Sequence, residues 1–305
     1  MKVLVFGAGS VGSFIGGLLS ERYDVTLLGR KHHMEAIEQN GLRITGKTEK
    51  LVRPKVWHSL GDLADIDLII LTVKAYNTET AMNDMVPYIR DDTLVLTLQN
   101  GLDNVETIRR MMKKEGHILA GITSHGVMRA EDGHIHHAGF GETVLGETVP
   151  SGRGHAEKVS EMLNSVGVQT RVSQNICGEM WAKAIVNAGI NPITAITGLR
   201  NGFLLKVPTL TALLERTCSE AIQVAQAARI HLPPCNIIEK TKDVARKTAE
   251  NKSSMLQDIE RGRRTEICSI SGYISEMGKR HGVDTPVNST LTALVKGIEE
   301  TARIR

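Results

Sequence analysis

Aromatic residues and excess charge are both scarce in this sequence. Aromatics make up 3% of the 305 residues, and the formal net charge is only +3. A surface that neutralises phosphates and stacks bases needs more of both, so we expect no nucleic-acid partner. Apolar runs of membrane-spanning length are missing too, and the run from Leu68 to Val73 has the length of a buried strand. We therefore expect no membrane partner.

Cysteine is also scarce, with four residues in the chain. They form no C-x-x-C pair and no dense framework, which predicts reduced thiols in a cytoplasmic protein. The length suffices for two domains, each with its own core, and a hydrophobic fraction of 41% is ordinary for such domains. The four cysteines are Cys177, Cys218, Cys235 and Cys268.

A glycine motif stands at the start of the chain, as Gly7-Ala8-Gly9-Ser10-Val11-Gly12. It follows the strand-like run Val3–Phe6 and precedes the apolar, helix-like segment Phe14–Leu19. In a dinucleotide-binding fold the first glycine makes the tight turn, the second lets backbone approach a pyrophosphate, and the third lets helix and strand pack closely. Strand, glycines and helix in this order predict a dinucleotide site.

The same segment has two competing interpretations, a secretory signal and a membrane helix with small residues at its contact face. Neither fits well, because glycines interrupt the apolar stretch and the charged residues Glu21 and Arg22 follow directly.

A basic corner follows the second predicted strand, Asp24–Leu28. It reads Gly29-Arg30-Lys31-His32-His33, at the place where an NAD-specific fold has an acidic residue for the ribose hydroxyl. A carboxylate repels a 2′-phosphate, whereas an arginine pairs with it. The corner therefore favours NADP, and its alternative is a solvated basic surface.

The first half of the chain alternates strand-like and helix-like segments, which predicts a parallel, doubly wound sheet with helices on both faces. Ligands bind such sheets at the carboxyl ends of the strands, which draws attention to Lys74, Asn100 and the stretch Thr123–His125. The expected strands are Val3–Phe6, Val25–Leu28, Leu68–Val73, Leu94–Leu98 and Ile118–Ile122.

The histidines of His134-Ile135-His136-His137 suggest a metal site. We expect no metal, because the alternating spacing suits a strand or hairpin and no cysteine or carboxylate set completes a ligand shell nearby. An exposed strand edge explains the pattern better.

Helical periodicity dominates beyond Val172, so we place the domain boundary between residues 174 and 175. The fold class is then α/β, with a Rossmann-type domain over 1–174 and an all-α domain over 175–305. The expected helices are Glu179–Asn191, Pro208–Ile230, Ile237–Ala249, one that ends near Gly282 and one that begins near Pro286.

Lys183, Asn187 and Asn191 are spaced four residues apart, which places an ammonium and two carboxamides on one helix face. The residues between them are apolar, and partial desolvation lowers the pKa of a lysine toward the range of a usable proton donor. The alternative is a surface lysine with two solvated asparagines. Pro192 predicts that the helix ends at Asn191, within reach of a ligand.

A second polar set begins at Ser254 and includes Glu266. On one straight helix these two residues would lie about 18 Å apart, too far to touch one small substrate. We expect Gly262 to break the helix, Thr265 to cap the next one and Glu266 to lie in its first turn.

Taken together, these motifs resemble the ketopantoate reductases, also called 2-dehydropantoate 2-reductases, over the length of the chain. The resemblance rests on the glycine motif and Arg30, on Thr72-Val73-Lys74-Ala75, Gln99-Asn100-Gly101, Thr123-Ser124-His125, Trp181-Ala182-Lys183-Ala184, Asn187, Ile190-Asn191-Pro192-Ile193-Thr194-Ala195, Asn201-Gly202, Ser253-Ser254-Met255-Leu256-Gln257-Asp258 and Thr265-Glu266-Ile267.

The resemblance implies a 6-phosphogluconate dehydrogenase-like fold and an NADPH-dependent reduction of the C2 ketone of 2-dehydropantoate to (R)-pantoate, on the way to pantothenate and coenzyme A. It implies catalytic roles for Lys183, as the general acid, and for Glu266. The implied cofactor-binding residues are those of the glycine motif with Arg30, Lys74, Asn100, Val127 and Glu266; the implied substrate-binding residues are Asn100, Lys183, Asn187, Asn191, Asn201 and Ser254.

Val127 departs from the family, which has alanine at this position. The resemblance therefore leaves open which 2-keto acid is the substrate. One alternative function is reduction of another branched 2-oxo acid on the same scaffold. Another is a non-catalytic NADP-binding regulator. A sensor needs the glycine loop but no proton donor, so the polar set argues against it: Lys183, Asn187, Ser254 and Glu266. Besides the small 2-keto acid, a homodimer is the partner assembly we carry forward.

Overall fold

The computed structural model describes residues 1–58, 65–112, 117–149 and 153–304, with side chains described up to Thr301 in the last helix. The chain divides into two compact units. Unit 1 comprises Met1–Gln99 and Asn104–Ile176, and unit 2 comprises Asn100–Asp103 and the chain from Cys177 onward. The main division thus falls two residues after the predicted one, and a four-residue turn within the first half joins the helical unit.

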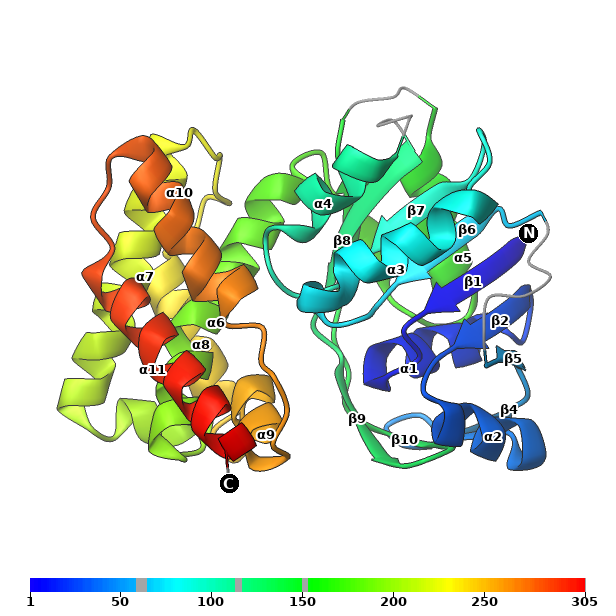
Figure 1. Cartoon of the computed structure of the whole chain (residues 1–305), viewed down its shortest axis with the longest axis horizontal. Helices are drawn as coiled ribbons and strands as arrows, with labels where there is room; N and C mark the ends of the chain where they lie inside the picture. The colour runs from blue at the N-terminus through cyan, green and yellow to red at the C-terminus, as the bar shows by residue number, and fades with distance from the viewer. Residues whose placement is uncertain (59–64, 113–116, 150–152, 305) are drawn as a thin grey trace. The chain divides into compact units, whose positions relative to one another are not determined.

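Unit 1 is built on an eight-stranded sheet with the order β12-β11-β8-β7-β6-β1-β2-β5. Figure 1 labels its strands from β5 through β2, β1, β6 and β7 to β8. All neighbouring strands pair in parallel except β8 and β11. The strands are β1 (Lys2–Phe6), β2 (Asp24–Leu28), β5 (Lys55–Trp57), β6 (Leu68–Leu71), β7 (Leu94–Thr97), β8 (Ile118–Thr123), β11 (Thr143–Glu147) and β12 (Thr170–Val172). The order β5-β2-β1-β6-β7-β8 is that of a dinucleotide-binding sheet, which confirms the predicted Rossmann-type domain.

The strand order reverses at β1, which has β2 on one side and β6 on the other. Ligands of open α/β sheets bind outside the carboxyl ends of the strands at this reversal. Gly7 follows β1 and Thr72 follows β6, so these two chain segments border the expected ligand position.

Helices cover both faces of the sheet because its strands are apolar on both sides. Along β1, Val3 and Val5 join one buried cluster and Leu4 joins the other, as the alternation of side chains requires. The first face carries α1 (Ser10–Leu19), α2 (Lys31–Asn40) and α5 (His155–Ser165), and the second carries α3 (Thr78–Met85) and α4 (Asn104–Met111), with 3₁₀ turns at Ala75–Asn77 and Val86–Tyr88.

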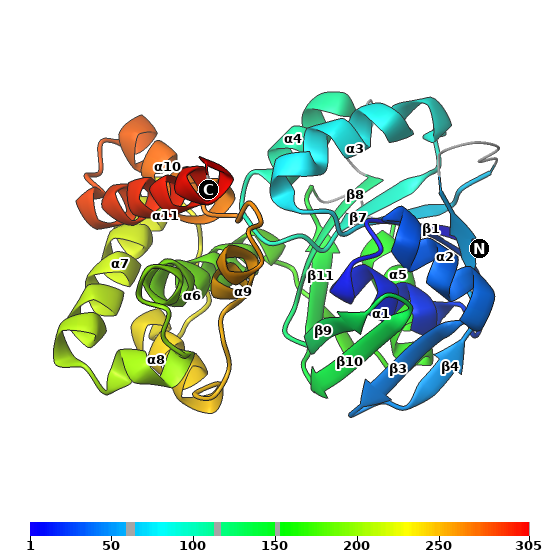
Figure 2. The ribbon, with the colours of Figure 1, turned by 60° about the horizontal axis from the view of Figure 1, so that its bottom comes forward.

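A second sheet in unit 1 has the order β4-β3-β10-β9 and was not foreseen as a whole. Figure 2 shows it beside α1. Its strands are β3 (Leu42–Gly46), β4 (Lys50–Val52), β9 (Gly126–Glu131) and β10 (His134–Gly139). The prediction that His134–His137 form an exposed edge was wrong, because β10 pairs with β3 on one side and β9 on the other.

Helix α1 packs against both sheets of unit 1, which explains its apolar character. All residues from Gly12 to Leu19 are buried. A helix that is apolar all round must be covered all round, and here two sheets cover it. No helix in the described part of the chain combines the length and hydropathy needed to span a bilayer.

Unit 2 is helical beyond its short N-terminal turn, as predicted. Its helices are α6 (Ile176–Thr197), α7 (Pro208–Ala227), α8 (Ile237–Lys247), α9 (Ser254–Glu260), α10 (Tyr273–His281) and α11 (Pro286–Ile304), with a 3₁₀ segment at Asn201–Leu205 and a π-turn at Cys268–Gly272. Pro208 occupies the first turn of α7, and Gly282 ends α10 with a left-handed φ of 70°.

The predicted end of a helix at Asn191 was wrong, because α6 continues through Pro192 to Thr197. A proline inside a helix leaves a carbonyl without its N–H partner and costs about 3 kcal/mol. Here burial favours continuation, since Ile193 and Ala195 are almost fully buried beyond the proline. The Thr194 hydroxyl also donates to the carbonyl oxygens of Ile190 and Asn191, each 3.0 Å away.

Candidate functional site

The glycine loop between β1 and α1 is closed on two sides and open on the third. A Cβ added to Gly7, whose φ is +104°, would lie 2.5 Å from the Val73 nitrogen. A Cβ on Gly12 would lie 2.4 Å from Thr72 Oγ1. A Cβ on Gly9 would meet nothing closer than 3.8 Å. The first and third glycines therefore allow close packing. The second, Gly9, faces open space, so a ligand can come close to the protein backbone there.

The first turn of α1 supplies the hydrogen-bond donors of this loop. The N–H groups of Gly7 and Ala8 both bond the Leu28 carbonyl, at 2.9 and 2.8 Å. Helix α1 begins after these residues, and the N–H groups of Ser10, Val11 and Gly12 in its first turn have no carbonyl partner within the helix, whereas the Ser13 N–H donates to the Gly9 carbonyl at 2.9 Å. Such a turn favours an anion, through its N–H groups and its dipole. The Ser10 hydroxyl accepts from the Arg129 N–H at 3.0 Å, which fixes the turn against β9.

The basic corner at the start of α2 is smaller than the sequence suggests. Arg30 is exposed and precedes the first residue of the helix, next to the exposed Lys31. His33 is fully buried, and its Nδ1 accepts from the Gly133 N–H at 3.0 Å while Nε2 lies 2.9 Å from the Ser13 hydroxyl. Its place in a charged corner was a wrong interpretation.

His33 carries no charge at neutral pH for a physical reason. Burial, and next the Arg129 guanidinium, lower the pKa of His33 to about 4, and Asp132 opposes them. The ring therefore acts as a neutral tie between α2, α1 and the turn before β10. Sequence patterns gave no signal for this role, because a histidine beside Arg30 and Lys31 reads as a third basic residue.

Polar residues follow β6 and β7, as the sheet topology predicts. Lys74 is partly buried, and its carbonyl accepts from the Asn77 N–H at 2.8 Å at the start of a 3₁₀ turn. Gln99 donates to the Val73 carbonyl at 2.9 Å and to the Thr78 hydroxyl at 2.8 Å. These hydrogen bonds connect the segment after β7 with the segment after β6, and they fix the backbone on both sides of Lys74.

Val127 lies on β9 opposite His137 and packs against the core of unit 1. His137 is buried, with its Nε2 3.2 Å from His125 Nδ1 and its Nδ1 2.9 Å from the Thr48 hydroxyl. Burial is the main cause that lowers the pKa of both histidines. Among the described residues, no group of three histidine, cysteine or carboxylate side chains has the arrangement of a metal site.

In unit 2 the three polar residues of α6 share one helix face, as their spacing predicts. Lys183 and Asn187 are partly buried, and Asn191 is buried with 7% exposure. Their neighbours Ala184 and Ile190 are almost fully buried. The alternative interpretation, an exposed lysine with solvated asparagines, was therefore wrong.

Burial changes the protonation of Lys183. Desolvation lowers the pKa of Lys183 to about 8, and the Glu266 carboxylate opposes this decrease. An ammonium with a pKa near neutrality donates a proton readily, and it is still charged for most molecules at pH 7.

A break after helix α9 separates Ser254 from Glu266, as predicted. Helix α9 ends at Glu260, and Gly262 turns the chain with a φ of +60°. The Thr265 hydroxyl accepts from the Ile267 N–H at 3.2 Å, but the predicted cap role of Thr265 was wrong, because the next helical segment begins at Cys268 with Ile267 as its cap residue and no side-chain cap. Glu266, with 7% exposure, lies two residues before this segment rather than in its first turn.

Asn100 lies in unit 2 with the other polar residues, although it follows a strand of unit 1. Its Nδ2 lies 3.4 Å from Glu266 Oε2 and donates to it. The structure thus brings together Lys183, Glu266 and Asn100, which are far apart in the sequence.

Asn201 and Ser254 differ in accessibility. Asn201 is buried, and its Nδ2 donates to the Thr248 hydroxyl at 2.9 Å, while its Oδ1 has no hydrogen-bond partner in the described part of the chain. Ser254 is exposed at the start of α9. The adjacent Ser253 is the helix cap, which accepts from the Leu256 N–H at 3.1 Å.

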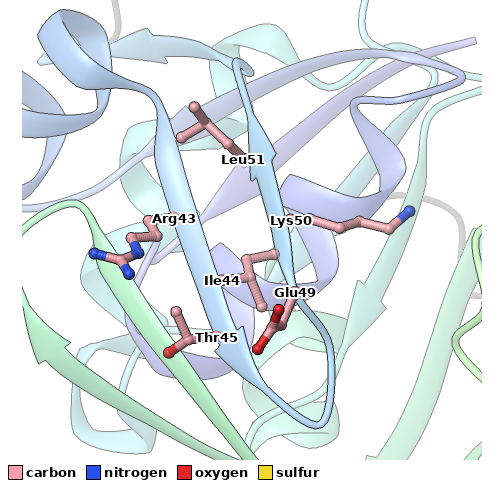
Figure 3. A pocket seen from close by; sticks show the side chains of 6 residues that line it. All are labelled: Arg43, Ile44, Thr45, Glu49, Lys50 and Leu51. Atoms are coloured by element: carbon pink, nitrogen blue, oxygen red, sulfur yellow. The ribbon is translucent and has the colours of Figure 1, made fainter.

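A hollow of about 410 Å³ lies on the β3–β4 hairpin of unit 1 (Figure 3). Its lining includes no residue that the sequence singles out for cofactor or substrate. Leu51 in its lining is 61% exposed, and the Lys50 ammonium pairs with Glu21 at 2.5 Å. The lining residues are Arg43, Ile44, Thr45, Glu49, Lys50 and Leu51.

A Rossmann-type unit with an open glycine loop, followed by a helical unit with a desolvated lysine, is typical of nucleotide-dependent oxidoreductases. The family models agree. The model "Ketopantoate reductase PanE/ApbA" matches residues 3–150, and "Ketopantoate reductase PanE/ApbA C terminal" matches residues 175–299. The chain belongs to the ketopantoate reductase family and is an oxidoreductase that acts on a CH-OH donor.

Curated relatives match along the full length. The chain is 41% identical over 303 residues to the 2-dehydropantoate 2-reductase of Pyrococcus horikoshii and 38% identical over 299 residues to that of Archaeoglobus fulgidus. In both cases the match covers 98% of each chain.

Solved structures show the same fold. The PanE/ApbA family ketopantoate reductase from Ralstonia eutropha superposes with a TM-score of 0.92 at 32% identity, over 99% of this chain and 100% of that one. A ternary structure of D-mandelate dehydrogenase with NADH and anilino(oxo)acetate gives a TM-score of 0.93 at 29% identity, with the same coverage.

Proposed function

We propose that this protein reduces the C2 ketone of 2-dehydropantoate to (R)-pantoate with NADPH, a step of pantothenate and coenzyme A biosynthesis. The observation that carries the proposal is the partly buried Lys183 on α6, whose pKa burial lowers to about 8 beside Glu266. The full-length relatives named 2-dehydropantoate 2-reductase support the substrate.

The residues of unit 1 fit a dinucleotide. Gly9 leaves open space above the loop, whereas Gly7 and Gly12 leave none, and this is the arrangement that a bound pyrophosphate requires. The exposed guanidinium of Arg30 is suited to pair with a 2′-phosphate, which favours NADPH over NADH. Bound there, the cofactor supplies the hydride for the ketone carbon.

The residues of unit 2 supply the proton and the polarisation. Hydride addition places negative charge on the ketone oxygen, and the Lys183 ammonium stabilises that charge and gives up its proton. Glu266 favours the charged form of this lysine, so that the proton is present when needed.

The carboxamides orient the acid. Asn187 and Asn191 on the face of Lys183, with Asn100, Asn201 and Ser254, supply donors and acceptors for the carboxylate and hydroxyl groups of the substrate. Lys74 and Val127 complete the residues that we assign to the cofactor. Each assignment follows the family resemblance and the position of the residue in its unit.

A second candidate is reduction of another 2-oxo acid on the same scaffold. The likeness to D-mandelate dehydrogenase, which was solved with NADH and anilino(oxo)acetate, supports this second candidate. A non-catalytic NADP-binding regulator is the third candidate, and the desolvated lysine argues against it.

The test is oxidation of NADPH by the purified protein with 2-dehydropantoate, run beside pyruvate, 2-ketoisovalerate and an NADH control. We expect fast turnover with 2-dehydropantoate and NADPH alone. Faster turnover of another acid would change the substrate and keep the mechanism. Binding of NADPH without turnover of any acid would favour the regulator.

Two further expectations belong to this proposal. The homodimer is tested by light scattering on the eluted protein, and the cytoplasmic location by cell fractionation.

A further inference from the structure

The turn Asn100–Asp103 makes two hydrogen bonds to the same residue of unit 2, Ser269. The Leu102 N–H donates to the Ser269 carbonyl at 3.0 Å, and the Ser269 hydroxyl donates to Asp103 Oδ2 at 2.9 Å. Backbone and side chain of the same serine therefore fasten the second half of the turn, at Leu102 and Asp103. None of the motifs singled out in the sequence contains Ser269 or Asp103.

Gly101 makes this close docking possible. Its φ is +99°, and an added Cβ would lie 2.7 Å from the Ser269 Cβ and 3.1 Å from the Ser269 carbonyl oxygen. A residue with a side chain would push the turn away from Ser269. The glycine after Asn100 thus has a packing reason within unit 2.

Ser269 is also fixed relative to Glu266. The Ser269 N–H donates to the Glu266 carbonyl at 3.1 Å; Ser269 is the second residue of the π-turn Cys268–Gly272, and Glu266 lies two residues before that turn. Single π-turns are rare and occur frequently at functional sites. One short segment therefore connects the backbone that carries Glu266 with the turn that carries Asn100.

We propose that Ser269 and Asp103 form a latch that positions Asn100 on Glu266, and through Glu266 sets the charge environment of Lys183. The latch is the hydrogen bond from the Ser269 hydroxyl to the Asp103 carboxylate. Both are positioning residues, since neither is assigned to substrate or cofactor. The proposal rests on the proposed function, in which Asn100, Glu266 and Lys183 act on a 2-keto acid.

The electrostatics around Asp103 make the Ser269 hydroxyl important. Burial raises the pKa of Asp103, the Ser269 hydroxyl lowers it, and the carboxylates of Glu266 and of Glu276 on α10 raise it. Asp103 Oδ1 is buried without a hydrogen-bond partner in the described part of unit 2. Removal of the hydroxyl leaves a poorly solvated carboxylate beside two others, which favours movement of the turn toward water.

Such movement has a specific consequence for Lys183. Glu266 opposes the effect of burial on the pKa of Lys183. When Asn100 no longer holds Glu266, the carboxylate can turn away, and the pKa of Lys183 then falls further. A structural defect alone lowers stability without this shift.

The test compares four variants of the full chain. Ser269→Ala and Asp103→Ala remove the latch, whereas Asp103→Asn keeps an oxygen that accepts from Ser269. Ser271→Ala is the matched control, because Ser271 lies in the same π-turn, is fully buried, and its hydroxyl has no partner among the described residues. We measure kcat/KM against pH, and thermal unfolding.

With the latch removed, we expect kcat/KM to fall about tenfold or more, since misplacement of a substrate-orienting group by 1 Å can cost up to about 100-fold. We also expect the alkaline limb of the profile to move to lower pH. Asp103→Asn and Ser271→Ala should stay within about twofold of the parent. If Ser269→Ala does not fold, the two Asp103 variants carry the same comparison.

Two results would overturn the latch. One is an unchanged profile in Ser269→Ala or Asp103→Ala, and the other is an equal loss in Ser271→Ala or Asp103→Asn. Failure of the proposed function is seen separately, in the parent protein. If the parent prefers another 2-oxo acid, the variants are assayed with that acid. If it turns over none, the pKa of Lys183 is followed by NMR of ¹³C-labelled lysine, assigned with Lys183→Arg, and the same shift is required.

Discussion

The two units carry their functional residues in different chemical forms. In unit 1 the glycine loop presents backbone N–H groups, and what matters at Gly7 and Gly12 is the absence of a side chain. In unit 2 the site consists of side chains, Lys183 and Glu266 among them, set in apolar surroundings. The first kind of site binds by shape and dipole, and the second changes the protonation of its groups.

This difference predicts opposite responses to substitution. Atoms added at Gly7 or Gly12 of unit 1 collide with neighbouring atoms and weaken the fold, whereas an atom added at Gly9 enters open space and weakens cofactor binding alone. Atoms removed from unit 2 leave the fold and abolish chemistry. Substitutions that separate stability, cofactor affinity and turnover therefore test whether the units divide the work in this way.

The largest effect is expected at Lys183. Lys183→Ala removes the proton donor and should lower kcat by about 10²–10⁴-fold, the usual contribution of a general acid. NADPH affinity, measured by fluorescence titration, should not change. Lys206→Ala is the matched control, since Lys206 lies in unit 2 over the ring of Phe203. Turnover retained in Lys183→Ala would remove the lysine from the mechanism.

The next effect separates two glycines of unit 1. Gly12→Ala places a methyl group 2.4 Å from Thr72 Oγ1 and 2.6 Å from the Gly7 carbonyl oxygen. Such overpacking typically costs about 1–3 kcal/mol of folding stability, so the melting temperature should fall. Gly9→Ala meets open space, and should weaken NADPH binding at an unchanged melting temperature. Equal melting temperatures for the two variants would contradict the geometry of the loop.

A smaller effect is expected at Arg30. A hydrogen bond to a charged group contributes about 1.5–3 kcal/mol, so Arg30→Ala should weaken NADPH binding by about tenfold or more. NADH lacks the 2′-phosphate, and its affinity should be unaffected. Lys31→Ala is the control, because Lys31 is an exposed neighbour that pairs with Glu35 at 3.8 Å. Parallel loss of both cofactors would assign Arg30 a structural role.

The same contrast explains which features the sequence predicts. The glycine loop and the strands around it follow from local spacing, and the strand Asp24–Leu28 was predicted to within one residue. The shared face of Lys183, Asn187 and Asn191 also follows from helical spacing. Local patterns are sufficient where a feature is made within one element.

Features made by distant segments were missed. Burial of His33 depends on Ser13 and Gly133, which no pattern near His33 reveals. Strand β10 gained a second neighbour, β3, from far along the chain. Continuation of α6 past Pro192 depends on burial, which outweighs the local preference of proline.

The finest comparison concerns pH, because it tests the protonation of one group in unit 2. Lys183 as general acid must carry its proton, and burial lowers its pKa to about 8 from the usual value of 10.5. Activity should therefore fall as pH rises through about 8, with kcat/KM halved there and about tenfold lower one unit above, as for a single titrating group. NADPH binding by the glycine loop, which has no titrating group in this range, should stay constant.

Glu266→Gln gives the sign of this effect a second check. The carboxylate raises the pKa of Lys183, so its neutral replacement should move the alkaline limb to lower pH. A limb that moved to higher pH, or a parent profile that stayed flat between pH 7 and about 9.5, would mean that a group other than Lys183 supplies the proton. The pH profile thus tests Lys183 as the acid through the effect of Glu266 on its pKa, whereas Lys183→Ala tests it by removing the ammonium.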